Sequence, residues 1–143
     1  MATESVIVKT VLTNDKLRFE TALRDNNPIV SDYIPPLGDG QGYMPLELFL
    51  TSMMTCAGGT IVSLLRKMRK TVAAFRIEAE GFRRDEHPTY FEKIVLRMEL
   101  VSPDATDEDM ARCIELSEEK FCPVWAMIRG NVEVACEFTI HQA

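Results

Sequence analysis

Apolar and polar residues alternate along the first third of the chain, a period of two that is typical of strands with one solvent-facing side. The alternation predicts strands at residues 5–12, 17–23 and 28–33. Polar residues with turn chemistry lie between them, at 13–16 and 24–27. The chain is therefore expected to begin with a β-meander of three strands.

A loop and a long helix are predicted next. Residues 35–42 are rich in proline and glycine and break every regular pattern. Pro45 suits the first turn of a helix, where the missing N–H of proline costs no hydrogen bond. The helix is predicted to run to about Lys70, where basic residues complement the negative end of its dipole. Gly58 and Gly59 weaken its middle, so one helix, a bent helix or a helix pair all remain open.

The second half of the chain predicts strands at residues 72–82 and 90–100, a helical region from about 102 to 129, and a closing strand at 132–140. The helical region divides at Pro123, which restarts a short helix. The order of elements is βββ-α-ββ-αα-β. This order predicts the α+β class, with an antiparallel sheet and long central helices.

We predict one domain, residues 1–143, because the chain shows no repeat, linker or low-complexity segment. Its parts are an N-terminal β-meander and loop at 1–44, a central helix at 45–70, and a ββ-αα-β segment at 71–143. A chain of 143 residues is long enough for one hydrophobic core.

The central helix contains a run without any charge, residues 48–65. Eighteen uncharged residues reach the lower bound for a membrane span. Seven of them are threonine, serine or glycine, however, and the neighbouring segments are amphipathic. We interpret the run as a helix that is buried on nearly all sides in a protein without a membrane span. Since a small domain cannot easily enclose such a helix, a homodimer is predicted.

Composition and charge narrow the function classes. The chain is 46% hydrophobic and 27% charged, which is ordinary for a globular protein. A net charge of −6 and a pI near 5.0 argue against nucleic-acid partners and a polybasic membrane patch. The N-terminal segment does not resemble a signal peptide, so a cytoplasmic location is expected. In a reducing compartment, important cysteines are more often chemical than structural.

No pattern of metal or cofactor binding is present in the sequence, so none is expected. The four cysteines contain no CxxC pair, and no HExxH motif, P-loop or dinucleotide-type glycine pattern occurs. The two histidines, His87 and His141, have no serine or cysteine at an informative spacing, which argues against a Cys–His hydrolase.

Two of the cysteines have positions that suit chemistry. Cys56 lies in the uncharged run beside small residues, which would let a substrate approach its sulfur, although a cysteine in such apolar surroundings is more often an inert core residue. Cys122 precedes Pro123 and is predicted to cap a helix, where the helix dipole should lower its pKa. A packing role remains open for it too. Cys113 and Cys136 have the positions of packing residues.

Glu47 is the only charged residue between Asp39 and Arg66. It lies in the first helical turn, where the dipole favours a carboxylate. Its apolar neighbours also predict partial burial, which would require a partner such as an arginine. Nine residues separate it from Cys56, so the two face opposite sides of a straight helix. For both to serve one pocket, the helix must break or a second subunit must contribute.

Taken together, these segments resemble the OsmC/Ohr family of organic hydroperoxide reductases and osmotically induced proteins. The resemblance covers essentially the whole chain and is most specific at residues 44–56 and 118–124, with a further match at 86–94. Its motif is a proline-x-glutamate helix start, a cysteine nine residues later, and a second cysteine in a Cys-Pro-Val. The resemblance implies an OsmC-like fold, an intertwined homodimer with helices between sheets, and two active sites at the interface.

The resemblance also implies a chemistry. Cys56 would be a peroxidatic thiolate that attacks an organic hydroperoxide, and Cys122 would resolve the sulfenic acid to a disulfide. A dithiol reductant, of the lipoyl type in this family, would then restore the thiols. Glu47 would belong to a polar network that holds an arginine against the peroxidatic sulfur.

The chain departs from the family pattern at that arginine. Where some members carry it in the loop before the helix, this chain has Leu37. Other members carry it at the first hairpin, where Arg18 is the nearest candidate, with Arg24 behind it. An opposite charge within ~4–6 Å of a thiolate can shift its pKa by ~1–3 units, so the arginine matters for reactivity. Two hypotheses follow: a thiol-dependent peroxidase for organic hydroperoxides, or a non-catalytic dimer that binds a hydrophobic small molecule.

Overall fold

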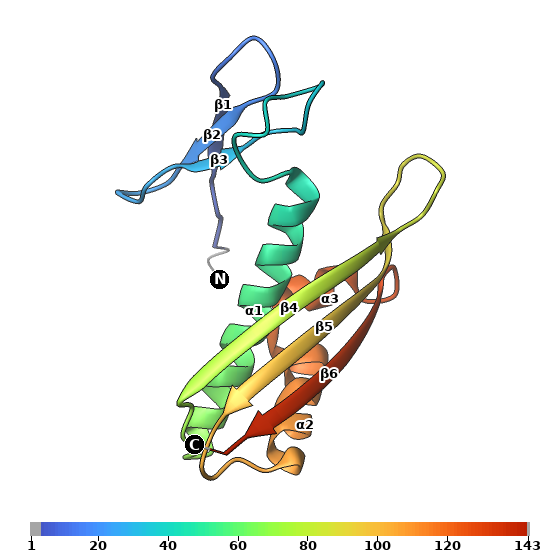
Figure 1. The fold of residues 1–143 in the computed structure, drawn as a ribbon. Helices are drawn as coiled ribbons and strands as arrows, with labels where there is room; N and C mark the ends of the chain where they lie inside the picture. Colours follow the sequence, from blue (N-terminus) through green and yellow to red (C-terminus); the bar gives the residue numbers. More distant parts are fainter. Residues whose placement is uncertain (1–3, 143) are drawn as a thin grey trace. The chain divides into compact units, whose positions relative to one another are not determined.

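A computed structural model describes residues 4–142 (Figure 1). The chain divides into two compact units, the first ending at Phe49 and the second beginning at Leu50, inside the long helix α1 (Pro45–Lys67). The outer ends of the predicted domain, residues 1–3 and 143, lie outside the described residues.

The first unit contains the predicted meander. Strands β1 (Lys9–Leu12), β2 (Phe19–Ala22) and β3 (Ile29–Ser31) form an antiparallel sheet in chain order. The strands are shorter than predicted. Residues 5–8 continue the alternating pattern, but pairing begins at Lys9 opposite Ala22, and the chain leaves β2 there for a turn.

A buried carboxylate organises the loop between β3 and α1. Asp32 is fully buried and accepts hydrogen bonds from the backbone N–H groups of Tyr33 at 2.7 Å, Gln41 at 3.0 Å and Asp39 at 3.2 Å. The Gln41 N–H, followed by those of Tyr33 and Asp39, lowers the pKa of Asp32 below its usual range against the effect of burial. Gly38 is required there, since a Cβ at this position would lie 2.2 Å from the Tyr33 carbonyl oxygen.

Helix α1 is one helix from Pro45 to Lys67, so Gly58 and Gly59 do not break it. It ends close to the predicted Lys70, with Arg69 in the left-handed region at φ 63°. Its fully buried side chains form one stripe with a spacing of four residues: Met53, Ala57, Ile61 and Leu65. The expected burial on nearly all sides is therefore not reached within one chain.

By length and composition alone, α1 would also suit a membrane span, the same ambiguity as in the sequence. In the second unit its buried stripe faces protein, and a Cβ at Gly58 would lie 3.3 Å from the ring of Phe75. This packing supports the interpretation of α1 as a core helix.

The second sheet corrects the predicted topology. Strands β4 (Ala74–Arg83) and β5 (Phe91–Val101) form an antiparallel hairpin, as expected. Strand β6 (Glu133–His141) pairs with the other edge of β5 and runs parallel to it. The sheet is therefore mixed, in the order β4-β5-β6, and not antiparallel throughout.

The reason is the helical connection between β5 and β6. It consists of α2 (Asp107–Leu116), the π-helical segment η1 (Ser117–Phe121) and α3 (Pro123–Ile128). Such a crossover carries the chain back along the sheet, so that the next strand begins at the same end as the previous one.

The helices of the second unit lie on one face of its sheet (Figure 1). Alternate residues of β5 point to that face and are almost completely buried, while the helices contribute the other half of the core. The fully buried side chains here include Ile94, Leu96, Met98, Leu100, Met110 and Cys113. The opposite face carries a charged ladder, in which Arg97 contacts Glu80 at 2.8 Å, Glu137 at 3.2 Å and Glu78 at 3.3 Å.

Candidate active site

Two of the four cysteines meet in the second unit. The Sγ atoms of Cys56, in the middle of α1, and Cys122, between η1 and α3, lie 3.1 Å apart. Both are free thiols, and a disulfide bond would require an approach to about 2.05 Å. The two cysteines are 66 positions apart in the sequence, so this contact is a product of the fold. The structure thus brings together the two cysteines that the sequence singled out.

Cys122 occupies the predicted cap of α3. Its backbone is extended, with φ −88° and ψ 107°, and Pro123 follows as the first helical residue. The Sγ atom accepts a hydrogen bond from the N–H of Trp125 at 3.4 Å. The Cys122 N–H in turn donates to the Ser117 carbonyl at 3.0 Å, which closes the π-helical turn. Such turns are frequent at functional sites.

The predicted direction of the Cys122 pKa is wrong. Burial, followed by the hydrogen bond to Cys56 and the charge of that group, raises the pKa of Cys122 to about 11. The N–H groups of Trp125 and Val124 act in the opposite direction but do not prevail. Cys122, only 2% exposed, is therefore a neutral thiol near pH 7 that donates to the Cys56 sulfur.

Cys56 is the more accessible member of the pair, since its side chain is half-buried while Cys122 is buried. Thr55, before it, and Gly59, nearly one helical turn after it, are exposed. A Cβ at Gly59 would meet no atom within 4 Å, so the backbone is open on that side. A reagent in solution can thus reach the Cys56 sulfur more easily than the buried Cys122 sulfur beside it.

The other two cysteines lie in packing positions. Cys113 is fully buried on α2, with its Sγ 3.6 Å from the Met68 Sδ, and burial raises its pKa, with a further contribution from the charge of Asp109. Cys136 is half-buried on β6, and burial, followed by the charge of Glu118, raises its pKa to about 12.

Glu47 caps the start of α1. Its Oε1 accepts the backbone N–H of Met44 at 2.7 Å, as the acidic residue of a capping box does. Glu47 is exposed, so the predicted partial burial is wrong for the single chain. Because α1 continues from Pro45 to Lys67, the helix break that would turn Glu47 and Cys56 to one side is absent from this helix.

Arg18 lies just before β2, in the first unit. Its Nη1 donates to Glu20 Oε2 at 2.7 Å and to Thr13 Oγ1 at 2.8 Å, while its Nε is buried without a hydrogen-bond partner. Arg24 lies in the next turn, at φ 56°. The roles of Arg18 and Glu47 at the sulfur pair remain predictions. Leu37, in the loop where some family members carry the arginine, is 64% exposed.

Sequence reasoning missed two polar centres, Asp32 and the cluster around Lys70, Asp104 and Asp109. The Thr106-x-x-Asp109 spacing was a readable signal of a capping box, and the structure confirms that box. Among residues 4–142, the structure contains no group of three or more histidine, cysteine or acidic side chains that could hold a metal ion.

Comparison with known proteins supplies relatives. The family described as OsmC-like protein matches residues 38–137. Protein YhfA of Escherichia coli is 30% identical over 96 residues, which are 67% of this chain and 72% of YhfA.

Two solved structures show the same fold. A hypothetical protein from Aquifex aeolicus is 25% identical, with a TM-score of 0.85 and 99% of both chains covered. An organic hydroperoxide resistance protein, OsmC, from Legionella pneumophila is 18% identical, with a TM-score of 0.70, covering 97% of this chain and 99% of its own. The second likeness is one of fold alone.

Proposed function

The chain belongs to the OsmC-like protein family, and on that premise we propose that it is a thiol-dependent peroxidase that reduces organic hydroperoxides. The family includes hydroperoxide peroxidases. The observation that carries the proposal is the contact of 3.1 Å between a half-buried and a buried cysteine sulfur. This arrangement suits a reaction in which one sulfur is oxidised and the other resolves it.

The proposed reaction has three steps. The Cys56 thiolate attacks the terminal oxygen of the hydroperoxide, so that the O–O bond breaks and the alkoxide leaves as an alcohol after taking a proton. Cys56 becomes a sulfenic acid. The Cys122 sulfur then attacks the Cys56 sulfur, and the hydroxyl leaves with the Cys122 proton as water. A dithiol, of the lipoyl type, reduces the disulfide by exchange and becomes a disulfide itself.

The remaining roles follow from the family resemblance. Glu47 would hold an arginine against the Cys56 sulfur, and Arg18 is the candidate. Nine residues separate Glu47 from Cys56, a spacing that favours opposite faces of a helix, and we propose that a second subunit completes the site. Proteins of this family are generally dimeric. We propose a cytoplasmic homodimer, where a reducing environment keeps both cysteines as thiols.

The first prediction concerns single turnover with cumene hydroperoxide, measured by stopped-flow. The reduced protein should consume one equivalent of peroxide and yield a Cys56–Cys122 disulfide, identified by peptide mass spectrometry. Cys56→Ser should abolish consumption. Cys122→Ser should still consume peroxide but accumulate sulfenic acid at Cys56.

Cys136→Ser is the matched control, since this half-buried cysteine has no part in the sulfur pair. It should react as the parent does. Consumption that persists in Cys56→Ser, or a parent that forms no Cys56–Cys122 disulfide, would sink the proposal.

The alternative is a non-catalytic dimer that binds a hydrophobic small molecule. Two observations favour it: Leu37 stands in place of the loop arginine, and an open apolar groove of about 500 Å³ lies between α1 and β4. The groove is lined by Met54, Val62, Phe75 and Ile77, among others. Unchanged thiols after exposure to peroxide, together with saturable binding of a fluorescent apolar probe, would favour this alternative.

A further inference from the structure

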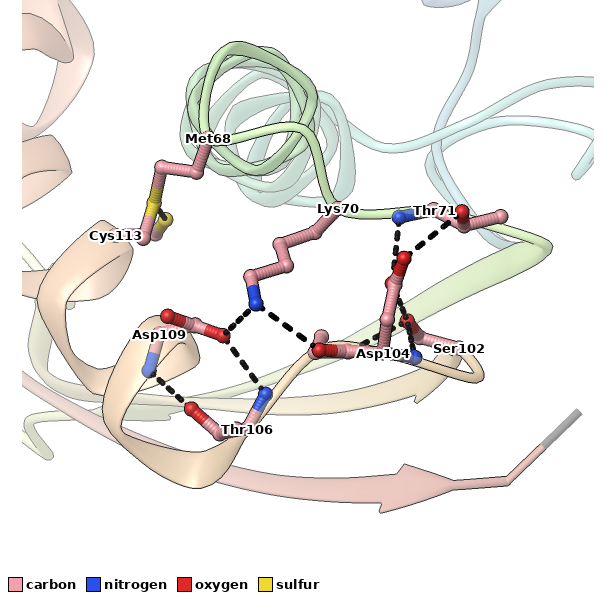
Figure 2. Close-up of polar contacts among 9 residues, drawn as sticks. Met68, Lys70, Thr71, Ser102, Asp104, Thr106, Asp109 and Cys113 are labelled. Carbon is pink, nitrogen blue, oxygen red and sulfur yellow. Dashed lines mark hydrogen bonds and ion pairs between the residues drawn. The ribbon is translucent and has the colours of Figure 1, made fainter.

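A second set of contacts joins the segment after α1 to α2, apart from the sulfur pair (Figure 2). The Lys70 Nζ lies 3.3 Å from the Asp109 Oδ2, in the first turn of α2, and donates to the Asp104 carbonyl at 3.1 Å. The next residue, Thr71, donates its N–H to the Asp104 carboxylate at 2.8 Å and its hydroxyl at 3.2 Å. We call the contacts of Lys70 and Thr71 with Asp104 and Asp109 the clasp.

Both acidic residues of the clasp are held firmly on their own side. Asp109 accepts the Thr106 N–H at 2.9 Å and donates its own N–H to Thr106 Oγ1 at 3.1 Å, in a reciprocal capping box. The buried Ser102 hydroxyl donates to the Asp104 carboxylate at 3.1 Å. Figure 2 shows these side chains converging from the end of α1 and the start of α2.

The clasp is also more sheltered than an ordinary surface ion pair. The side chains of Lys70 and Asp109 are 28% and 16% exposed. Those of Arg112 and Glu115, an ion pair within α2, are 57% and 54% exposed. Solvent screens the clasp less, and the clasp spans two elements where the Arg112 pair joins residues of one helix.

The clasp and the sulfur pair lie at similar chain distances along two paths: one runs from α1 to the residues just after it, and the other from the start of α2 to the end of η1. Cys56 precedes Lys70 by 14 residues (56 to 70), and Cys122 follows Asp109 by 13 (109 to 122). Met68 and Cys113, whose sulfurs are 3.6 Å apart, form a contact between them. The paths therefore run antiparallel, joined near both ends. Because helices are stiff along their axes, a slip at the clasp would displace one sulfur relative to the other.

We propose that Lys70, Asp104 and Asp109 are positioning residues that set the register of α1 against the α2–η1 segment, and thereby hold the Cys122 sulfur on the Cys56 sulfur. The role deepens the proposed function and rests on it. The clasp acts on the formation of the disulfide and not on the attack of Cys56 on peroxide. Loosening it lowers the effective concentration of one thiol at the other.

The test is the equilibrium of the purified protein with mixtures of reduced and oxidised dithiothreitol, quenched by alkylation and read by mass spectrometry at Cys56 and Cys122. Lys70→Met removes the charge but keeps an apolar chain of similar length. It should lower the equilibrium constant for the disulfide about fivefold or more. Lys70→Arg should restore it. Arg112→Met, which removes the comparison ion pair, should leave it unchanged.

Asp109→Asn is the second variant, should Lys70→Met fold poorly, because an amide oxygen can still accept the Thr106 N–H. It too should lower the constant. An unchanged constant in the folded Lys70→Met or Asp109→Asn variant would overturn the proposal, as would an equal fall in Arg112→Met. The dithiothreitol equilibrium needs no peroxide. A parent that forms the disulfide but does not consume cumene hydroperoxide would therefore refute the peroxidase and leave the clasp measurable.

Discussion

At Cys122, two influences on the thiol pKa oppose each other. A helix N-terminus stabilises a nearby negative charge by roughly 0.3–1 kcal/mol, which is less than one pKa unit of about 1.4 kcal/mol. Burial disfavours the thiolate and can raise the pKa of a thiol by up to several pKa units. The larger effect prevails, and the pKa of Cys122 rises to about 11. Cys122 therefore remains protonated near pH 7 and donates its hydrogen bond to the Cys56 sulfur, which supports the proposal that Cys56 carries the reactive sulfur.

The second prediction concerns this coupling. In Cys56→Ala, the hydrogen bond and the charge that Cys56 supplies are removed, so the pKa of Cys122 should fall below about 11. It should remain above the ordinary value because burial persists. The measurement is the pH dependence of alkylation at Cys122, followed by peptide mass spectrometry. Cys136→Ala is the control, and a profile that Cys56→Ala leaves unmoved would contradict the coupling.

These residues also show what the sequence can and cannot predict about a site. The Cys122-Pro123 dipeptide predicts a helix cap because capping is local, and the structure confirms it. The burial of Cys122 depends on the packing of distant segments, including α1, and no local pattern encodes it. For Glu47, the apolar neighbours in the sequence predicted burial, but the structure leaves it exposed. Neighbouring residues of a helix point in different directions around it, so the carboxylate of Glu47 remains at the helix cap.

Among the elements, the period of the apolar pattern located the strands, α1 and the helical region after β5 to within a few residues, but it did not predict the π-helical segment η1. It did not predict the direction of β6, since strand pairing is set by the crossover through α2, η1 and α3. Nor did it predict the clasp, whose partners lie more than 30 residues apart. In physical terms, local periodicity encodes which face is buried, while the partners of that face are decided by the whole chain.

The third prediction concerns acid stability at the start of α2. The N–H of Thr71, followed by the hydroxyl of Ser102, lowers the pKa of Asp104, and the N–H of Thr106 lowers that of Asp109, both against desolvation. A carboxyl with a lowered folded pKa stabilises the fold above its unfolded pKa of about 3.9, and this stabilisation is lost as pH falls through the folded value.

The melting temperature of the parent should therefore drop steeply below about pH 4. Asp104→Asn should melt lower at neutral pH but depend less on pH in the acid range, as measured by differential scanning calorimetry. Asp107→Asn is the control, because Asp107 lies in the same turn outside the clasp. Parallel melting curves for parent and Asp104→Asn would count against the role of Asp104.

For the whole molecule, a single chain leaves uncharged and apolar surface exposed to solvent. Helix α1 buries one stripe and leaves Thr55, Gly59 and Ser63 exposed beside Cys56. The sheet of the first unit exposes Val11 and Ile29, and large apolar residues in the open are unfavourable in water. Cover by a second copy would remove these surfaces from solvent.

The last prediction tests that cover. Light scattering of the parent should give twice the 16.2 kDa of one chain. In an isolated chain, Gly59→Arg would leave the fold unstrained, since a Cβ at this position meets no atom within 4 Å. In a dimer closed over this face of α1, the buried charge should shift the mass toward the monomer and slow peroxide consumption. Ala111→Arg, on the exposed side of α2, should change neither. A parent of 16.2 kDa whose activity survives Gly59→Arg would show that one chain suffices.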